Sequence, residues 1–253
     1  MKKGKPYLLS IAGFDPSGGA GVLADIKTFE AHKVTGFGIV TNLTFQTENK
    51  FLGLEEISYQ TIEKQLDPLL NQYEIKFVKV GLVKDLKMAL FIFEKLKTYK
   101  DDMFIVWDPV MGSSSGYDFW ASETQNKQLL SLCLKNINLV TPNVPELKKM
   151  FGNDIELGIK NIVEHCHLVL KGGHQEKEKA VDVFVEKNDV KRLKYKSKKI
   201  SLNEKHGSGC VFSASLLSNL ALGYGFHHAM LKTKRYMNKF FNSSQELLGY
   251  HKF

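Results

Sequence analysis

The chain of 253 residues has little arginine, although its formal net charge is +8. Arg192 and Arg235 are the only arginines among 35 basic residues. Proteins that bind nucleic acid usually grip phosphates and base edges with arginine side chains, so we expect no nucleic-acid partner. The excess of lysine fits a solvated surface, or a positive field that attracts a phosphorylated ligand.

Cysteine, proline and long apolar runs are also scarce. The three cysteines, Cys133, Cys166 and Cys210, are widely spaced and odd in number, which predicts free thiols and a cytoplasmic location. No segment reaches the ~18–20 apolar residues of a membrane span, and the apolar stretch near the N-terminus is broken at Gly13 before a signal peptide is complete. We therefore expect no membrane partner and one globular domain over residues 1–253.

Short apolar runs alternate with segments of helical periodicity along most of the chain. Strands are expected at 7–12, 38–43, 77–80, 104–107, 139–141 and 167–170, and helices at 20–32, 61–72, 86–99, 123–134, 145–151 and 155–166. This alternation predicts right-handed crossovers and a largely parallel sheet in an α/β sandwich. Two successive strands at 180–186 and 192–195 then predict an antiparallel edge, before closing helices at 208–222 and 227–248.

Glycine-rich loops follow several of the expected strands, where open α/β sheets bind their ligands. These loops span residues 13–21, 108–116, 171–174 and 206–210. The first has the glycine spacing of a P-loop, but Gly19-Ala20 stands where Lys-Ser/Thr is required. No G-x-G-x-x-G follows a strand, which argues against a dinucleotide oxidoreductase.

Two other motifs have simpler structural explanations. Gly112-x-Ser114-x-Gly116 matches a nucleophile elbow, but no strand leads directly into it and no helix follows, so a serine-rich loop is favoured over an esterase. In His165-Cys166-His167, adjacent side chains point in different directions and no second pair lies at metal-ligand spacing. A structural origin is therefore favoured over a metal site.

The segment His206-Gly207-Ser208-Gly209-Cys210 opens an expected helix directly after a loop. Its glycines allow backbone N–H groups to converge at the positive helix end, which suits a phosphate or a developing anion. The helix field is expected to lower the pKa of the Cys210 thiol. A glycine-rich cap with a buried cysteine is the alternative.

A set of ordered motifs resembles the hydroxymethylpyrimidine/phosphomethylpyrimidine kinases of thiamine biosynthesis, within the ribokinase-like superfamily. The motifs lie at residues 11–21, 24–29, 79–81, 108–111, 141–146, 171–174 and 206–210. The resemblance implies a ribokinase-like three-layer α/β/α sandwich with a mostly parallel central sheet and an antiparallel edge. It also implies phosphate transfer from ATP, with Mg²⁺, to the hydroxymethyl group of 4-amino-5-hydroxymethyl-2-methylpyrimidine. Many members then form the diphosphate, and the family forms homo-oligomers, mostly dimers.

The resemblance further implies roles for residues that match the family's motifs. Cys210 would be the general base, and Gly207, Ser208 and Gly209 would form the anion hole. Gly13, Asp25 and Gln46 would contact the pyrimidine, and Leu82 would line its pocket. Glu146 and Asp108 would organise Mg²⁺, with Asn143 and Lys171 near the nucleotide phosphates. The amide of Gln46 suits an aminopyrimidine edge because it offers both a donor and an acceptor.

Two departures from the family's pattern leave alternatives open. Ser115 stands where the family often has lysine, and Glu204-Lys205 stands where it often has Asn-Thr. Lys205 would contact the phosphates if it replaces the missing cation; otherwise it is a surface lysine. The rival functions are a pyridoxal kinase of the same fold, for which residues around Gln46 discriminate, and a non-catalytic pyrimidine-binding protein.

Overall fold

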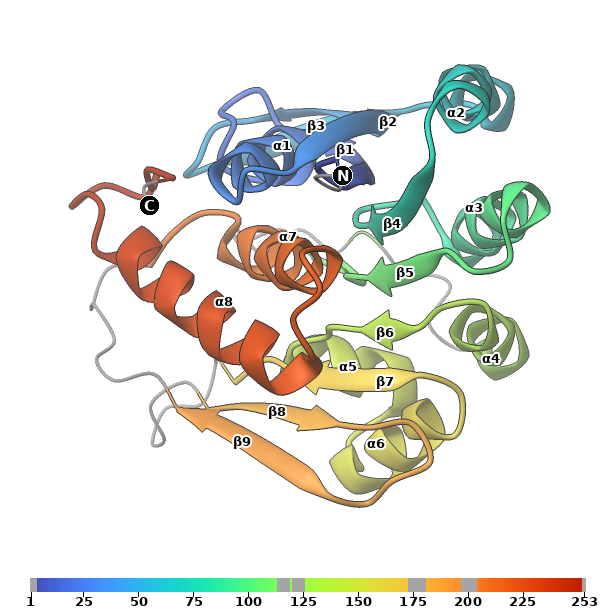
Figure 1. Cartoon of the computed structure of the whole chain (residues 1–253), viewed down its shortest axis with the longest axis vertical. Helices are drawn as coiled ribbons and strands as arrows, with labels where there is room; N and C mark the ends of the chain where they lie inside the picture. The colour runs from blue at the N-terminus through green and yellow to red at the C-terminus, as the bar shows by residue number, and fades with distance from the viewer. Residues whose placement is uncertain (1–3, 113–118, 120–125, 173–180, 197–203, 252–253) are drawn as a thin grey trace.

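The computed structural model describes residues 4–112, 119, 126–172, 181–196 and 204–251. Within these residues, one sheet has the strand order β3-β2-β1-β4-β5-β6-β7-β8-β9 (Figure 1). The strands are β1 (Tyr7–Phe14), β2 (Thr35–Gln46), β3 (Phe51–Glu56), β4 (Ile75–Val80), β5 (Phe104–Trp107), β6 (Leu139–Val140), β7 (His167–Leu170), β8 (Val181–Val185) and β9 (Arg192–Lys196). The six strands from β2 to β7 in this order are parallel, as predicted.

Both edges of the sheet are antiparallel. The pairs β7·β8 and β8·β9 form the edge that the sequence predicted. The hairpin of β2 and β3 at the opposite edge was not predicted. Strand β3 (Phe51–Glu56) contains Gly53 and ends in two glutamates, residue types that are depleted in strands, and none of its residues is buried. It therefore lacks the sequence pattern of a strand.

Helices cover both faces of the sheet, so the fold is the expected three-layer α/β/α sandwich. The helices are α1 (Gly21–Ala31), α2 (Tyr59–Gln72), α3 (Leu86–Tyr99), α4 (Lys127–Lys135), α5 (Val144–Phe151), α6 (Ile155–Val163), α7 (Ser208–Ala221) and α8 (Phe226–Phe241). Helices α1, α7 and α8 lie on one face, and α2 to α6 lie on the other (Figure 1). No described helix has both the length and the apolar character needed to cross a membrane.

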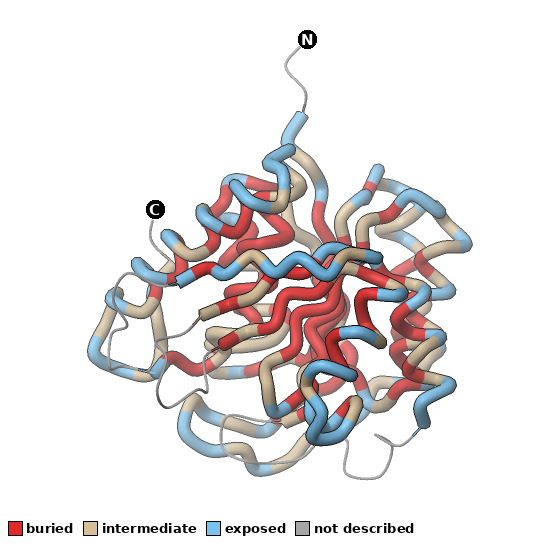
Figure 2. Tube along the Cα trace, turned by 90° about the horizontal axis from the view of Figure 1, so that it is seen from below, coloured by how far each residue is buried: buried red, intermediate tan, exposed pale blue. Residues whose placement is uncertain are grey.

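Alternation along the strands builds a core on each face. Leu8 packs with Phe29 and Leu217 on the α1/α7 side, whereas Leu9 packs with Ile62 and Phe93 on the other. The central strands are accordingly buried along most of their length (Figure 2).

One predicted helix is too long. Helix α8 ends at Phe241 rather than at residue 248, and Ser243 donates its backbone N–H to the carbonyl of Phe240. The expected helix at 123–134 begins at Lys127 in the described residues, and its first part lies outside them.

Candidate active site

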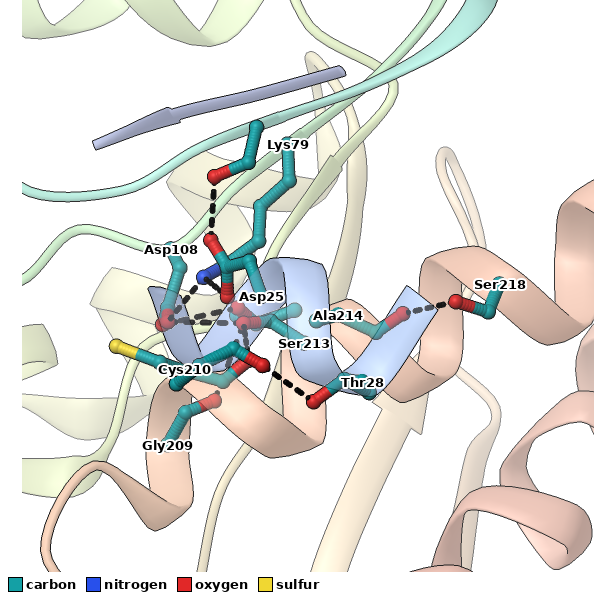
Figure 3. A network of polar contacts seen from close by, with 12 residues as sticks. Asp25, Thr28, Lys79, Asp108, Gly209, Cys210, Ser213, Ala214 and Ser218 are labelled. Carbon is teal, nitrogen blue, oxygen red and sulfur yellow. Dashed lines mark hydrogen bonds and ion pairs between the residues drawn. The ribbon is translucent and has the colours of Figure 1, made fainter. Parts of the chain in front are cut away.

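The loops that follow the parallel strands converge on the N-terminal turn of α7. At the centre, Lys79 on β4 donates a hydrogen bond of 2.6 Å to Asp25 on α1. Asp25 accepts a second hydrogen bond, of 2.6 Å, from the Ser10 hydroxyl on β1 (Figure 3). Both charged side chains are 0% exposed. Lys79 points to the α1/α7 side because its neighbours Val78 and Val80 point to the other core.

Asp108, directly after β5, continues this row of charges. Its carboxylate lies 3.9 Å from the Lys79 ammonium and 2.7 Å from that of Lys171, which follows β7. The hydroxyls of Ser213 and Thr141 donate to the same carboxylate, at 2.9 and 3.2 Å. Opposite charges therefore alternate from the buried Asp25, Lys79 and Asp108 to the partly buried Lys171.

The surroundings explain the protonation of these groups. Burial alone would lower the pKa of Lys79, but the nearby Asp25, Cys210 and Asp108 outweigh it and raise that pKa. For Asp108, burial opposes ionisation, but Lys171 and Lys79 bring its pKa below the usual value. Lys79 and Asp108 are thus charged at neutral pH, whereas burial raises the pKa of Asp25.

Glu146 and Asn143 cap the start of α5 beside Lys171. The Glu146 carboxylate accepts from the Asn143 backbone N–H at 2.7 Å, and the Asn143 side chain accepts from the Glu146 N–H at 2.8 Å. The Lys171 ammonium lies 3.9 Å from the Glu146 carboxylate. Burial raises the pKa of Glu146 to about 7, against the opposing effect of Lys171.

The carboxylates of Asp108 and Glu146 thus share one ammonium partner, Lys171. No group of three or more potential metal ligands occurs among the described residues. Mg²⁺ usually takes only one or two carboxylates and completes its shell with waters and substrate phosphates. The two oxygen donors fit that requirement.

The start of α7 packs directly onto the loop between β1 and α1. Gly207 has a φ of 68°, and a Cβ there would lie 2.0 Å from the carbonyl oxygen of Gly19, so only glycine fits. His206 contacts Asp15 across the same junction, at 2.8 Å between Nε2 and Oδ2. A Cβ on Gly209 would lie 3.3 Å from the Lys171 ammonium. The positive end of a 14-residue helix therefore lies beside a cation.

Comparison with known proteins agrees with this geometry. The family described as phosphomethylpyrimidine kinase matches residues 15–252. The chain belongs to the phosphomethylpyrimidine kinase family. A member from Aquifex aeolicus (strain VF5), named hydroxymethylpyrimidine/phosphomethylpyrimidine kinase, is 32% identical over 247 residues, which cover 94% of this chain and 95% of the relative.

Solved structures of a phosphomethylpyrimidine kinase and of a pyridoxal kinase share this fold. A crystal structure of phosphomethylpyrimidine kinase from Clostridium difficile 630 has a TM-score of 0.77 and 33% identity, and the match covers 92% of this chain and 98% of that one. An ADP complex of Bacillus subtilis pyridoxal kinase has a TM-score of 0.82 and 26% identity, with 98% and 97% covered. The ribokinase-like fold expected from the resemblance is thereby confirmed.

Within this kinase fold, the expected phosphate-side residues lie together. Gly207, Ser208 and Gly209 are partly exposed at the start of α7, near Lys171. Asn143 is joined to Lys171 by an isolated backbone bridge. These residues place backbone donors and an ammonium where an anion could bind.

Cys210 lies in the first turn of α7, near Asp108 and Asp25 (Figure 3). The prediction that the helix field lowers its pKa is wrong. Burial raises the pKa of the thiol to about 11, and although Lys79 opposes this, Asp108 and Asp25 add to it. Desolvation and two carboxylates outweigh the helix end, so the free enzyme holds Cys210 as a thiol at neutral pH.

The expected pyrimidine-contacting residues are only partly brought together. A Cβ on Gly13 would lie 3.0 Å from Leu82 Cδ2, so these two residues are adjacent. Gln46 is half-buried and ends β2, three residues beyond the predicted end of the strand. The fully buried carboxylate of Asp25 accepts hydrogen bonds from Ser10 and Lys79, and its contact with the pyrimidine stays a prediction.

Lys205 also departs from expectation. Its ammonium is buried and donates to the Ser244 carbonyl and hydroxyl, at 2.9 and 2.7 Å, and to the Glu246 carbonyl. Burial lowers its pKa. The buried side chain thus anchors the segment after α8, which fits neither the phosphate contact nor the surface position that the sequence left open. Ser115, which stands where the family often has a lysine, lies outside the described residues.

Several residues of this site had no predicted role. Lys79 was part of a recognised motif. Its position between Val78 and Val80 in an apolar strand could have indicated that this lysine is buried. Nothing local identified Ser213 as a partner of Asp108, because the two are far apart in the sequence. The Gly112–Gly116 motif lies mostly outside the described residues.

Proposed function

We propose that this chain phosphorylates the hydroxymethyl group of 4-amino-5-hydroxymethyl-2-methylpyrimidine with ATP and Mg²⁺, in thiamine biosynthesis. The observation that carries the proposal is the convergence of Lys171, the start of α7 and Cys210 at one end of a buried row of charges. Family membership supplies the substrate class.

The phosphate side follows from the positive groups. Lys171 and the backbone N–H groups of Gly207, Ser208 and Gly209 would stabilise charge on the transferring phosphoryl group. Asp108 and Glu146 would hold Mg²⁺, which when bound neutralises charge on the phosphate oxygens. Lys171 contacts both carboxylates in the free enzyme, so these groups rearrange when nucleotide and metal bind.

Cys210 would accept the proton of the substrate hydroxyl. With a thiol pKa of about 11, only a small thiolate fraction exists at neutral pH, and that fraction is the reactive base. Lys79 favours the thiolate electrostatically, and Asp25 holds Lys79 in place. Asp25 therefore acts through Lys79, which differs from the pyrimidine contact expected from the family resemblance.

The substrate ring would bind near Gly13, Leu82 and Gln46. Gly13 and Leu82 lie side by side, and the Gln46 amide supplies a donor and an acceptor for an aminopyrimidine. Formation of the diphosphate and assembly into dimers are further proposals from family membership.

Incubation with the pyrimidine alcohol, ATP and Mg²⁺, with mono- and diphosphate products separated, tests the proposal. Pyridoxal is the second alcohol to assay, because the Bacillus subtilis pyridoxal kinase is similar in fold and 26% identical. Faster turnover of pyridoxal would overturn the proposal. Thermal stabilisation by the pyrimidine without ADP formation would favour a binding protein instead.

A further inference from the structure

Strand β2 has an irregular register opposite Gly13. Ala12 pairs with Val40 and Phe14 pairs with Leu43, so both Thr41 and Asn42 lie opposite the single residue Gly13. An extra residue of this kind bends a strand and redirects its side chains, and such bulges are frequent beside active sites.

The hydroxyls on either side of Asn42 have backbone partners. Thr41 donates to the carbonyl of Leu82 at 2.6 Å, and Thr44 donates to the carbonyl of Phe14 at 2.8 Å. Both partners belong to the neighbourhood of Gly13. This part of β2 is therefore tied to the region where we place the substrate ring.

Asn42 itself is buried without a partner. It is 1% exposed, and neither Nδ2 nor Oδ1 of its side chain has a hydrogen-bond partner within the described part of the chain. The buried Asn219 on α7 is a useful contrast, because its Nδ2 donates to the Ser215 carbonyl and the Thr233 hydroxyl. An unpaired buried amide destabilises a protein and calls for an explanation.

The alternation of β2 shows on which side this amide lies. Leu43 and Phe45 are 36% and 50% exposed, whereas Asn42 and Thr44 are buried. Asn42 and Thr44 therefore share the inner face of this part of the strand. Because Thr44 reaches Phe14 from that face, the Asn42 amide lies on the side of the loop that follows β1.

We propose that Asn42 is a substrate-recognition residue whose carboxamide hydrogen bonds to the polar edge of the bound heterocycle. The inference rests on the proposed function and adds a second amide to that of Gln46. An aminopyrimidine carries ring nitrogens that accept and an amino group that donates, so it satisfies both atoms of the Asn42 amide. The free enzyme thus retains an unpaired polar group that substrate binding satisfies.

Replacement by a similarly sized apolar residue tests this role. Asn42→Leu is expected to raise the KM for the pyrimidine alcohol about tenfold or more, with the KM for ATP changed less than twofold. The Tm of the free enzyme should equal or exceed that of the parent, because an unpaired buried amide is removed. The rise in Tm produced by saturating pyrimidine should shrink.

Asn219→Leu is the matched control, since it removes a buried amide that has partners. It should lower the Tm and leave the KM for the pyrimidine unchanged. A fall in Tm for Asn42→Leu like that of the control, with unchanged KM, would overturn the inference. An equal rise in both KM values would also overturn it.

The parent enzyme separates this inference from the proposed function. If it phosphorylates only pyridoxal, the proposed function is wrong, and the KM of Asn42→Leu for pyridoxal then decides the role of Asn42. If the parent uses the pyrimidine and the variant does so equally well, only the inference about Asn42 is wrong.

Discussion

Replacing Lys79 with methionine tests whether the buried row of charges holds the site together. The substitution keeps an apolar stem of similar length but removes the ammonium. Asp25 would then retain only the Ser10 hydroxyl as a partner, and Asp108 would lose one of its two nearby cations.

The expected loss is large because neither partner is exposed to solvent. Removing one member of a buried ion pair costs about 3–5 kcal/mol, a large part of the roughly 5–15 kcal/mol by which domains are stable. For a chain of this size, this corresponds to a fall in Tm of about 6–20 °C. Adding Asp25→Asn to Lys79→Met should restore part of the stability, since the unpaired charge is also removed.

The loss should also depend on pH. Burial raises the pKa of Asp25 and Lys79 opposes that rise, so the variant raises it further. Asp25 then takes up a proton on folding, and stability falls as pH increases through the interval between its unfolded and folded pKa values. The deficit relative to the parent is therefore larger at pH 8 than at pH 5.

Urea denaturation followed by circular dichroism measures these free energies, with Lys84→Met as the matched control. Lys84 also contacts a carboxylate at 2.6 Å, that of Glu56, but the two side chains are 43% and 45% exposed. This control should unfold like the parent. The reasoning fails if Lys79→Met is as stable as Lys84→Met. It also fails if the double variant, Lys79→Met with Asp25→Asn, is less stable than Lys79→Met alone.

Four further outcomes are expected. The half-saturating Mg²⁺ concentration should rise as pH falls below about 7, because burial raises the pKa of Glu146 to about 7 and the carboxyl must lose its proton to hold the metal. Mg²⁺ titrations of enzyme activity at pH 6 and 8 measure this, with Glu146→Gln as the control for protonation of ATP itself. An equal pH effect in the parent and in Glu146→Gln would contradict the prediction. Cys210→Ala should lower kcat about 10²- to 10⁴-fold. The kcat/KM of the parent should climb with pH toward about 11, and a profile that levels off near neutrality would contradict a base with that pKa in the free enzyme. Gln46→Leu should raise the KM for the pyrimidine far more than that for ATP in steady-state assays, and equal effects would refute its role. Lys205→Met should lower the Tm without raising the KM for ATP. Adding Ser244→Ala to Lys205→Met should lower the Tm little further, because both substitutions break the same contact. A higher KM for ATP in Lys205→Met would support the phosphate contact instead.

The sequence predicted the architecture well because strands and helices have local signals. Alternating apolar runs and helical periodicity predicted the parallel centre and the antiparallel edge at β8 and β9. Strand β3 lacked such a signal because it is an edge strand with no buried residue. Helix α8 was predicted too long because residues 242–248 are mostly of types that helices tolerate. In the structure the hydroxyls of Ser243 and Ser244 donate hydrogen bonds to backbone carbonyls, and the helix ends before them.

The site was predicted less completely because its chemistry depends on contacts between distant residues. Family motifs indicated Asp108, Lys171 and the start of α7, which the fold brings together. The pairing of Asp25 with Lys79 spans 54 positions and has no local signal. The raised pKa of Cys210 likewise results from burial and from carboxylates on other elements, which helix position alone does not reveal.

The contact between the first loop and the segment after α8 has a consequence for biosynthesis. His206 donates its backbone N–H to Leu247, and its side chain meets Asp15, 191 positions earlier in the chain. Chains emerge from the ribosome N-terminus first, at about 5–20 residues per second. A nascent chain in which all the described strands are complete would therefore still lack the contacts that brace the start of α7. We expect the start of α7 to be ordered only after Leu247 has left the exit tunnel.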